Sequence, residues 1–495
     1  MATAPVLRDY QERAITLVRE CWRERPILML PTGAGKTVVA SAMIHAAVKK
    51  GRRVLFLVHR RELVRQAVTR LADWGIDAGV FAAGWKPSAS PVQVASIQTL
   101  SRRGVRLLAG LVVVDECQHV RAKTWEEILD DYAKSGACTV GLSATPYRLD
   151  GRGLGHTFGR IVNPVTVQQL CDEGVLIEPR VFAPPGPDLK GVHKRAGEYV
   201  LSELAERMEK LEGNIIDHWL QIAKGMRTVV FAVDIQHSRQ LVDRFNEAGV
   251  RAAHVDGTFS AGERDAVLDA LAAGDLDLVS NCMVLGEGWD LPALECAVLA
   301  RPTASLALHR QQIGRIMRAA PGKEGALVLD HAGNTLRHGR VTDEVEVSLD
   351  DRAKRDAALA IKTCPMCFCV CLSTAKECPE CGHEFSADTE RERPKESDGK
   401  LVELGKREHA TQVYRDLVRK ASRWGNRIGW ARYKYKSGHG FWPSDRRGLG
   451  RGAAKIEADE YSCRGYEAKS RQYGGEVCGR CFRREDEHER VGLSW

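Results

Sequence analysis

The chain has 495 residues, of which 44% are hydrophobic and 28% charged, a composition that excludes wholesale disorder and allows roughly two to four packed domains. The formal net charge of +8 is mild, and Met1–Arg8 lacks the apolar core of a secretory signal. No apolar run approaches the roughly 18–20 residues that span a bilayer, so the sequence predicts a cytoplasmic protein without membrane partners.

Short apolar runs alternate with longer amphipathic stretches through most of the first 335 residues. Most of these runs are continuous, which is typical of parallel strands buried on both faces. We therefore predict an α/β protein with two parallel-sheet domains, residues 1–160 and 215–345, joined by a proline-punctuated connector over 161–214. The expected strands are Ile27–Leu30, Val54–Val58, Val92–Ala95, Leu111–Val114, Thr139–Leu142, Val229–Ala232, Leu276–Ser280, Ala297–Ala300 and Ala326–Leu329.

A glycine-rich turn, Leu30-Pro-Thr-Gly-Ala-Gly-Lys-Thr37, follows the first expected strand. Gly33 and Gly35 let backbone N–H groups face phosphates at the start of a helix. Lys36 is expected to neutralise the β- and γ-phosphates of ATP, and Thr37 to bind Mg²⁺. The strict phosphate-loop pattern places glycine where this chain has Leu30.

The strand Leu111–Val114 ends in Asp115 and Glu116. Open α/β sheets place ligand-binding groups at the carboxyl ends of their strands. Asp115 is expected to hold Mg²⁺ and Glu116 to orient and deprotonate the attacking water. A solvated turn is the alternative for two adjacent acids, and the phosphate loop upstream argues against it.

These motifs resemble those of superfamily-two helicases of the broad DEAD/DEAH type, over about residues 5–340. Leu7–Gln11 resembles the upstream glutamine motif, which implies that Gln11 reads adenine. Asp115–His119 resembles the second motif, but Gln118 occupies its fourth place and His119 follows. Whether Gln118 or His119 relays the nucleotide state to the third motif, Ser143–Pro146, is left open. The resemblance implies two tandem RecA-like domains.

The second domain carries two further resemblances. Gly286–Pro292 resembles the fifth motif, which places Gly288 and Asp290 at the nucleotide. Gln311–Arg318 resembles the sixth motif, which implies that Arg315 and Arg318 are arginine fingers reaching the γ-phosphate as the domains close. A solvated helix face is the alternative for this arginine pair.

The same resemblance predicts a path for nucleic acid, contacted mainly through phosphate and sugar. The first domain contributes Val58–Val64 and the pair Gln98 and Thr99, and the second contributes Phe231–Asp234 and Ser280. Arg60 and Arg61, within the first of these runs, could instead be ordinary surface charges.

A zinc ribbon is predicted over residues 360–386 from two Cys-Pro-x-Cys pairs. Two thiolates on each tight turn supply the four sulfurs of a tetrahedral Zn²⁺ site. The expected ligands are Cys364, Cys367, Cys378 and Cys381, although Cys369 and Cys371 are further thiols nearby. A ribbon of this size needs its metal in order to fold.

The remaining sequence divides into a charged linker over 387–410, a basic aromatic module over 411–450 and a polar tail over 451–495. The module holds ten Lys or Arg residues against Asp416 and Asp445, interleaved with aromatic residues, which suits phosphate contact and base stacking. A small helical domain with an aromatic core is the alternative. In the tail, Cys463, Cys478, Cys481 and His488 have the irregular spacing of a possible second zinc site.

The sequence as a whole predicts an ATP-dependent helicase or translocase with ATP, Mg²⁺ and Zn²⁺ as cofactors. DNA is favoured over RNA, because the second motif and the basic aromatic module resemble those of DNA motors. One alternative is a double-strand DNA motor that remodels or anneals without unwinding. Another is a degenerate binding module, against which the intact Lys36, Asp115, Glu116, Arg315 and Arg318 argue.

Overall fold

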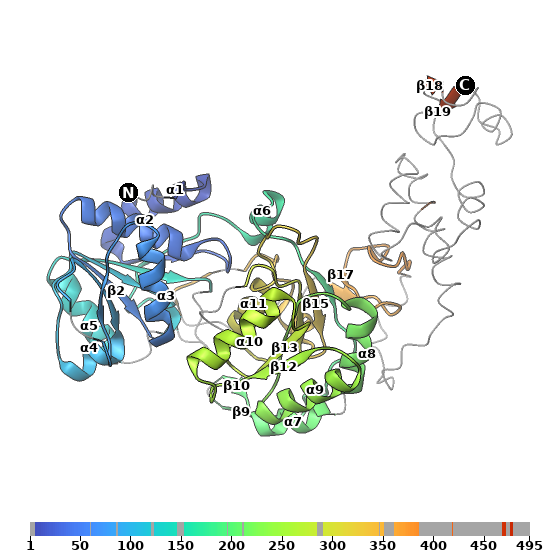
Figure 1. Cartoon of the computed structure of the whole chain (residues 1–495). Coiled ribbons are helices and arrows are strands. Elements are labelled where there is room, and N and C mark those ends of the chain that lie inside the picture. The colour runs from blue at the N-terminus through green and yellow to red at the C-terminus, as the bar shows by residue number, and fades with distance from the viewer. Residues whose placement is uncertain are drawn as a thin grey trace. The chain divides into compact units, whose positions relative to one another are not determined.

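The computed structural model describes most of the first 385 residues and short pieces beyond them (Figure 1). The described residues are 5–59, 61–85, 88–119, 123–145, 153–195, 197–209, 212–284, 291–345, 347–350, 361–385, 418, 468–471 and 476–478. The chain forms two compact units, one of residues 1–363 with 368–372 and the other of residues 364–367 with 373–495.

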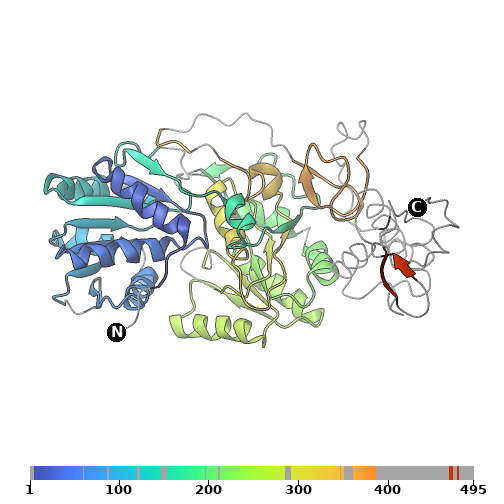
Figure 2. The same ribbon diagram turned by 90° about the horizontal axis from the view of Figure 1, so that it is seen from above.

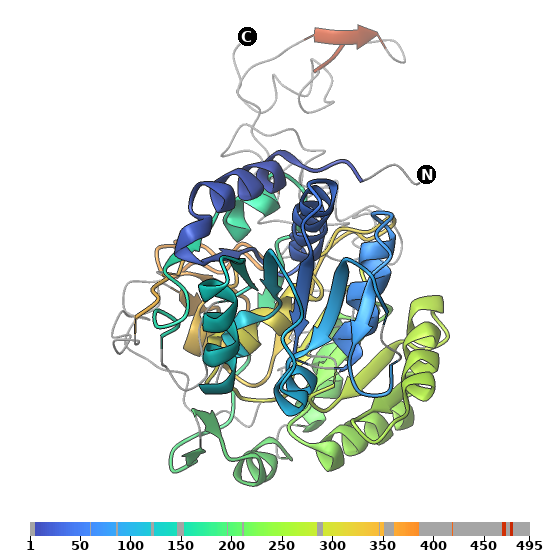
Figure 3. The same ribbon diagram turned by 90° about the vertical axis from the view of Figure 1, so that its left-hand side faces the viewer.

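The first sheet of the larger unit has seven parallel strands in the order β3-β4-β2-β5-β6-β1-β7. Helices lie on both sides of it (Figures 2 and 3). The strands are β1 (Pro26–Met29), β2 (Val54–Val58), β3 (Gly79–Phe81), β4 (Val92–Ser96), β5 (Leu111–Val114), β6 (Cys138–Ser143) and β7 (Arg160–Val162). The helices are α1 (Asp9–Glu20), α2 (Lys36–Lys49), α3 (Arg61–Ala72), α4 (Ile97–Arg103) and α5 (Lys123–Lys134).

Burial on both faces explains why strand β2 is apolar without interruption. Val54, Phe56 and Val58 pack into one cluster together with side chains of α2 and α3. Leu55 and Leu57 point to the opposite face, into a second cluster formed with α4 and α5. Successive side chains of a strand alternate between faces, so a strand covered on both faces needs apolar residues at every position.

The second sheet has six parallel strands in the order β12-β13-β11-β14-β15-β8. The strands are β8 (Arg180–Phe182), β11 (Thr228–Phe231), β12 (Ala252–Val255), β13 (Leu278–Asn281), β14 (Cys296–Leu299) and β15 (Leu327–Asp330). The helices after β11 are α9 (Ile235–Glu247), α10 (Ala261–Ala273), α11 (Leu306–Gly314) and α12 (Asn334–His338). In chain order, α6 (Val167–Asp172) lies between β7 and β8. The hairpin of β9 (Lys194–Arg195) and β10 (Glu198–Tyr199) and the helices α7 (Leu201–Glu209) and α8 (Glu212–Ile222) lie between β8 and β11.

The prediction of two parallel α/β sheets is confirmed, and each expected strand is present within two residues of its predicted bounds. The expected connector contributes more regular structure than its prolines indicate. It supplies β8, which pairs with β15 at an edge of the second sheet, and nearly all of β7, which pairs with β1. Strands this short carry too few residues to produce a recognisable apolar run.

Little regular structure is described beyond the second sheet. The larger unit also holds the antiparallel pair β16 (Ile361–Thr363) and β17 (Val370–Leu372), and the smaller unit holds β18 (Ala468–Arg471) and β19 (Glu476–Cys478). The predicted linker and nearly all of the basic module lie outside the described residues, as do Cys463, Cys481 and His488 of the possible second zinc site. Among the described helices, none is long and apolar enough to cross a membrane.

Candidate nucleotide site

The phosphate-loop turn joins the end of β1 to the start of α2. Gly33 and Gly35 have φ values of +90° and +82°, in the left-handed region that favours glycine. A Cβ atom at either position would also crowd a neighbouring side chain. A Cβ atom on Gly33 would lie 2.9 Å from Cδ2 of Leu176, and one on Gly35 would lie 2.7 Å from Nε2 of Gln11. The positive φ values are therefore the main reason why this loop favours glycine at both positions.

Helix α1 places Gln11 directly against this loop. The Gln11 side chain is buried, and its Nε2 donates to the Ala34 carbonyl oxygen at 3.3 Å. The Tyr10 hydroxyl donates to the same oxygen at 2.8 Å. These contacts place Gln11 beside the turn that the sequence predicts to bind ATP. That Gln11 reads adenine stays a prediction, and the position of its side chain suits it.

Lys36 begins helix α2 and lies among the other predicted catalytic residues. Its Nζ is 3.4 Å from the Leu30 carbonyl oxygen. Burial lowers the pKa of Lys36, the carboxylates of Glu116 and Asp115 oppose this shift, and the guanidinium groups of Arg318 and Arg315 add to it. The structure thus brings the other four predicted catalytic residues within electrostatic reach of Lys36.

The acidic pair at the end of β5 is linked to the third motif through Gln118. Nε2 of Gln118 donates to Oε2 of Glu116 at 2.7 Å, and the Ser143 hydroxyl donates to Oε1 of Gln118 at 2.7 Å. The Gln118 side chain is only 5% exposed, and both ends of its amide are hydrogen-bonded. Glu116 has a φ of +45°, which is uncommon for a residue with a side chain and turns the chain directly after β5. The side chain of His119 lies outside the described residues.

The residues of the sixth motif lie against the phosphate loop. A Cβ on Gly314, at the end of α11, would lie 2.6 Å from Cβ of Thr32, so the two backbones approach closely. Cγ of Arg318 would lie 3.1 Å from a Cβ on Gly33. Burial lowers the pKa of Arg318 to about 10, and the charge of Arg70 adds to the shift. Groups from both sheets therefore meet at one loop.

Some predicted nucleotide-site residues lie outside the described part of the chain. These are Gly288 and Asp290 of the run that resembles the fifth motif, and Pro146 of the third. Thr37 is described as the second residue of α2, and Asp115 follows β5 directly. Both lie where the sequence expects the magnesium ligands, at the carboxyl ends of strands and the start of a helix.

We predict that Gln118→Leu weakens the coupling of hydrolysis to movement more than hydrolysis itself. Leucine has a similar volume but makes neither the Glu116 nor the Ser143 hydrogen bond. We expect kcat for ATP to fall about 10-fold, or about 1.4 kcal/mol, which corresponds to one or two lost hydrogen bonds. Measuring translocation and ATP consumption together should show a larger fall in steps per ATP. Unchanged coupling would contradict a link through Gln118. The control for the loss of an amide is Gln66→Leu, at an exposed glutamine of α3 in the same domain.

The predicted nucleic-acid path includes both surface and interior residues. Gln98 accepts from the Ser96 hydroxyl at 2.7 Å and donates to the His59 carbonyl oxygen at 2.7 Å, across the paired ends of β2 and β4. Thr99 and Phe231, by contrast, are buried. Arg60 lies outside the described residues, and α3 begins at Arg61.

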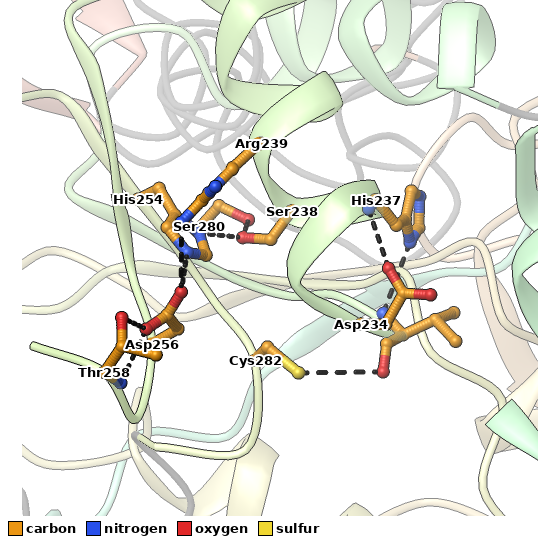
Figure 4. A network of polar contacts seen from close by, with 10 residues as sticks. Asp234, His237, Ser238, Arg239, His254, Asp256, Thr258, Ser280 and Cys282 are labelled. Atoms are coloured by element: carbon orange, nitrogen blue, oxygen red, sulfur yellow. Dashed lines mark hydrogen bonds and ion pairs between the residues drawn. The ribbon is translucent and has the colours of Figure 1, made fainter. Parts of the chain in front are cut away.

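A chain of polar contacts joins the carboxyl ends of β12 and β13 to helix α9 (Figure 4). Nε2 of His254 lies 2.8 Å from Oδ2 of Asp256, and its Nδ1 lies 2.7 Å from the Ser238 hydroxyl. The Ser238 hydroxyl lies 2.6 Å from that of Ser280. Burial opposes ionisation of Asp256, but hydrogen bonds from Thr258 and His254 outweigh it and hold its pKa at about 2.

The ionised Asp256 determines the direction of these hydrogen bonds. A carboxylate only accepts, so Nε2 of His254 carries a proton. With the proton on Nε2 alone, Nδ1 accepts from the Ser238 hydroxyl, whose oxygen can accept from Ser280. Ser280 is fully buried, so its hydroxyl braces the interior of the domain and does not line a surface.

The sequence analysis missed this network. Its signal was the run His254-Val-Asp-Gly-Thr258, which begins within β12 and continues into the turn after it. Strand β12 reads Ala-Ala-His-Val, and its histidine and alanines do not form the apolar run that marks a buried strand.

The four predicted zinc ligands come together in the smaller unit. The sulfur atoms of Cys364 and Cys381 are 3.6 Å apart, as are those of Cys367 and Cys378, and all four lie within 4.8 Å of one another. Zn–S bonds of about 2.3 Å in a tetrahedron put sulfurs about 3.8 Å apart, so this donor set fits Zn²⁺. The turn of the second pair is closed by Gly382, whose N–H donates to the Cys378 carbonyl at 3.0 Å and whose φ is +78°.

We expect the purified protein to contain one zinc ion per chain, lost in Cys378→Ser, because a hydroxyl is a poor replacement for a thiolate. Metal content measured by mass spectrometry should drop to background in this variant. Cys171→Ser replaces a half-buried cysteine of α6 and should keep the metal. Full zinc content in Cys378→Ser would contradict the four-cysteine assignment.

Fold and site together define a phosphate-loop ATPase with two tandem RecA-like domains. Residues 4–148 match the family model "Type III restriction enzyme, res subunit", and residues 207–320 match "Helicase conserved C-terminal domain". With the motifs in order on both sheets, the chain belongs to the superfamily-two helicases and is an ATP-dependent enzyme of that class.

Three similar proteins each match about two thirds of this chain or more. A "51.5 kDa protein" of Lactococcus phage (isolate 7-9) is 28% identical over 77% of this chain and 83% of its own length. The "Putative ATP-dependent helicase IRC3" of Saccharomyces cerevisiae is 32% identical over 67% of this chain and 52% of its own length. The "Putative DNA 3'-5' helicase Rad25" of Halobacterium salinarum is 27% identical over 67% of this chain and 56% of its own length. The chain thus spans only about half the length of the latter two.

A solved structure shares the fold. It is a fragment of a putative HsdR subunit of a type I restriction enzyme from Vibrio vulnificus, with a TM-score of 0.53 and 22% identity over 68% of this chain and 67% of that one.

Proposed function

We propose that this protein is an ATP-driven motor that moves along DNA. The observation that carries the proposal is the meeting of Lys36, Asp115 and Glu116 from the first sheet with Arg315 and Arg318 from the second. Because catalytic groups come from two domains, hydrolysis depends on how the domains sit together. A nucleic-acid strand held by both domains could therefore control the rate.

The proposed roles follow from the charges and hydrogen bonds of the site. Lys36, Arg315 and Arg318 stabilise negative charge on the phosphates, and Glu116 accepts a proton from the attacking water. Thr37 and Asp115 would hold a magnesium ion, which supplies neutralisation of phosphate charge when bound. Gln118 is hydrogen-bonded to both Glu116 and Ser143 of the third motif, so a movement of Glu116 is transmitted to Ser143.

DNA is the proposed substrate for two reasons. The Halobacterium relative is named a putative DNA helicase. In addition, residues 411–450 carry a net charge of 10 − 2 = +8 with interleaved aromatic rings, a composition suited to a polyanion with exposed bases.

A zinc ion bound by the four cysteines would stabilise the fold of the ribbon.

The test is ATPase activity measured with single-stranded, duplex and forked DNA and with RNA. We expect at least one DNA form to raise kcat about 10-fold or more, because closure on a strand completes the site. Equal rates with and without every nucleic acid would contradict the motor proposal. Stimulation by duplex alone, with no strand separation in a gel assay, would favour the double-strand translocase or annealing motor.

A further inference from the structure

The backbone directly after helix α11 is held by the side chain of Lys323. Helix α11 ends at Gly314, and carbonyl groups at the end of a helix lack partners within it. Nζ of Lys323 donates to the carbonyl oxygens of Ile316 at 2.5 Å and Arg318 at 2.8 Å. It also lies 3.4 Å from the Pro292 carbonyl oxygen, where the run that resembles the fifth motif ends.

We propose that Lys323 is a positioning residue for Arg318. It binds the main-chain carbonyl of the arginine itself and ties that residue to the end of the fifth-motif run, so that the guanidinium is presented at a constant place. The proposal rests on the proposed function, in which Arg318 stabilises charge on ATP. The three carbonyl groups that Lys323 contacts all belong to the second domain.

Contacts on the other side of the same segment support this role. Leu176 forms an antiparallel bridge with Arg318, and the Ile177 N–H donates to the Met317 carbonyl oxygen at 2.7 Å. The segment 316–318 is therefore held by backbone from the connector on one side and by Lys323 on the other. Displacing a catalytic group by about 1 Å can cost about 100-fold in rate, so the precision of this support matters.

The chemistry of the ammonium group suits the task. A lysine ammonium has three donors, and three carbonyl oxygens lie around it. Burial lowers the pKa of Lys323 to about 8, the carboxylate of Glu295 opposes this, and the charge of Arg318 adds to it. The group is half-buried, so water replaces these hydrogen bonds poorly when the lysine is removed.

The first measurement compares Lys323→Met with the wild type in the full-length protein, using DNA-stimulated ATPase. Methionine keeps the unbranched stem and loses all three donors. We expect kcat to fall roughly 10-fold while KM for ATP changes less than about twofold, because Arg318 acts mainly in the transition state. Lys323→Arg should recover most of kcat because it can still donate, and Lys224→Met, at an exposed lysine of the same domain, should match the wild type.

A double-mutant cycle separates positioning from simple helix capping. If Lys323 acts through Arg318, Lys323→Met should cause no further loss in the Arg318→Ala background. An equal loss in both backgrounds, or an unchanged kcat in Lys323→Met, would overturn the proposal. Unfolding midpoints are measured for each variant, so that a loss of stability is told apart from a loss of kcat. The variant Lys323→Gln keeps one donor group and should give a kcat between those of the methionine and arginine variants.

Failure of the underlying function would look different. If Arg318→Ala alone kept the wild-type kcat, the role of Arg318 would be wrong and the inference about Lys323 would fall with it. If Arg318→Ala were inactive and Lys323→Met fully active, only the positioning role would be lost.

Discussion

Replacing Lys36 with alanine should abolish ATP hydrolysis. Lys36 begins α2 within electrostatic reach of both acids and both arginines, and it is the cation that the phosphate loop itself supplies. We expect kcat to fall by about 10³-fold, in the range seen when a main source of transition-state charge stabilisation is removed. Phosphate release with saturating DNA measures this directly.

The matched control is Lys49→Ala, which removes an exposed lysine from the last turn of the same helix. It should leave turnover unchanged and the unfolding midpoint within about 2 °C. Undiminished turnover in Lys36→Ala with the control active would remove the central claim that this loop is the ATPase site.

A second large effect is expected for Arg318→Ala. An arginine that reaches the phosphates from a second domain contributes about 10³-fold or more to kcat. Its side chain lies against Gly33 of the phosphate loop in the first domain, although Arg318 itself belongs to the second domain, where it follows helix α11. We expect stimulated turnover to collapse while the affinity for a fluorescent ATP analogue changes less than about tenfold, since the loop itself is intact.

Arg318→Lys distinguishes charge from geometry. Lysine keeps the positive charge but lacks the planar fork of donors, so it should recover only a small part of kcat. Arg195→Ala, at an exposed arginine of β9, is the control for lost surface charge. Nearly normal stimulated turnover in Arg318→Ala would show that the close approach to Gly33 is structural only.

The local parts of the molecule were readable from the sequence because they depend on short-range rules. A buried parallel strand must be apolar throughout, so β2 and β5 stood out as continuous runs. Gly33 and Gly35 predicted a glycine-rich turn before α2, and in the structure both glycines have positive φ. The two Cys-Pro-x-Cys pairs likewise predicted a cluster of four thiols, and the structure brings these sulfurs together.

Other features depend on which segments meet in space, and the sequence carried weak signals for them. The edge strand β8 has only three residues and the edge strand β12 includes a histidine, so only their pairing with β15 and β13 identifies them as strands. The network of His254, Asp256 and Ser238 draws on strand ends and a helix that are far apart in the chain.

By itself, the sequence determined that the protein uses ATP and has two α/β domains, because these follow from motifs a few residues long and from strand hydropathy. Only the tertiary structure showed which side chains contact one another. It connects Gln118 to both Glu116 and Ser143, and it places Lys323 on the carbonyl of Arg318. Such contacts depend on distances of about 3 Å between atoms that the chain order leaves unrelated, so they become visible only once the sheets and loops are folded.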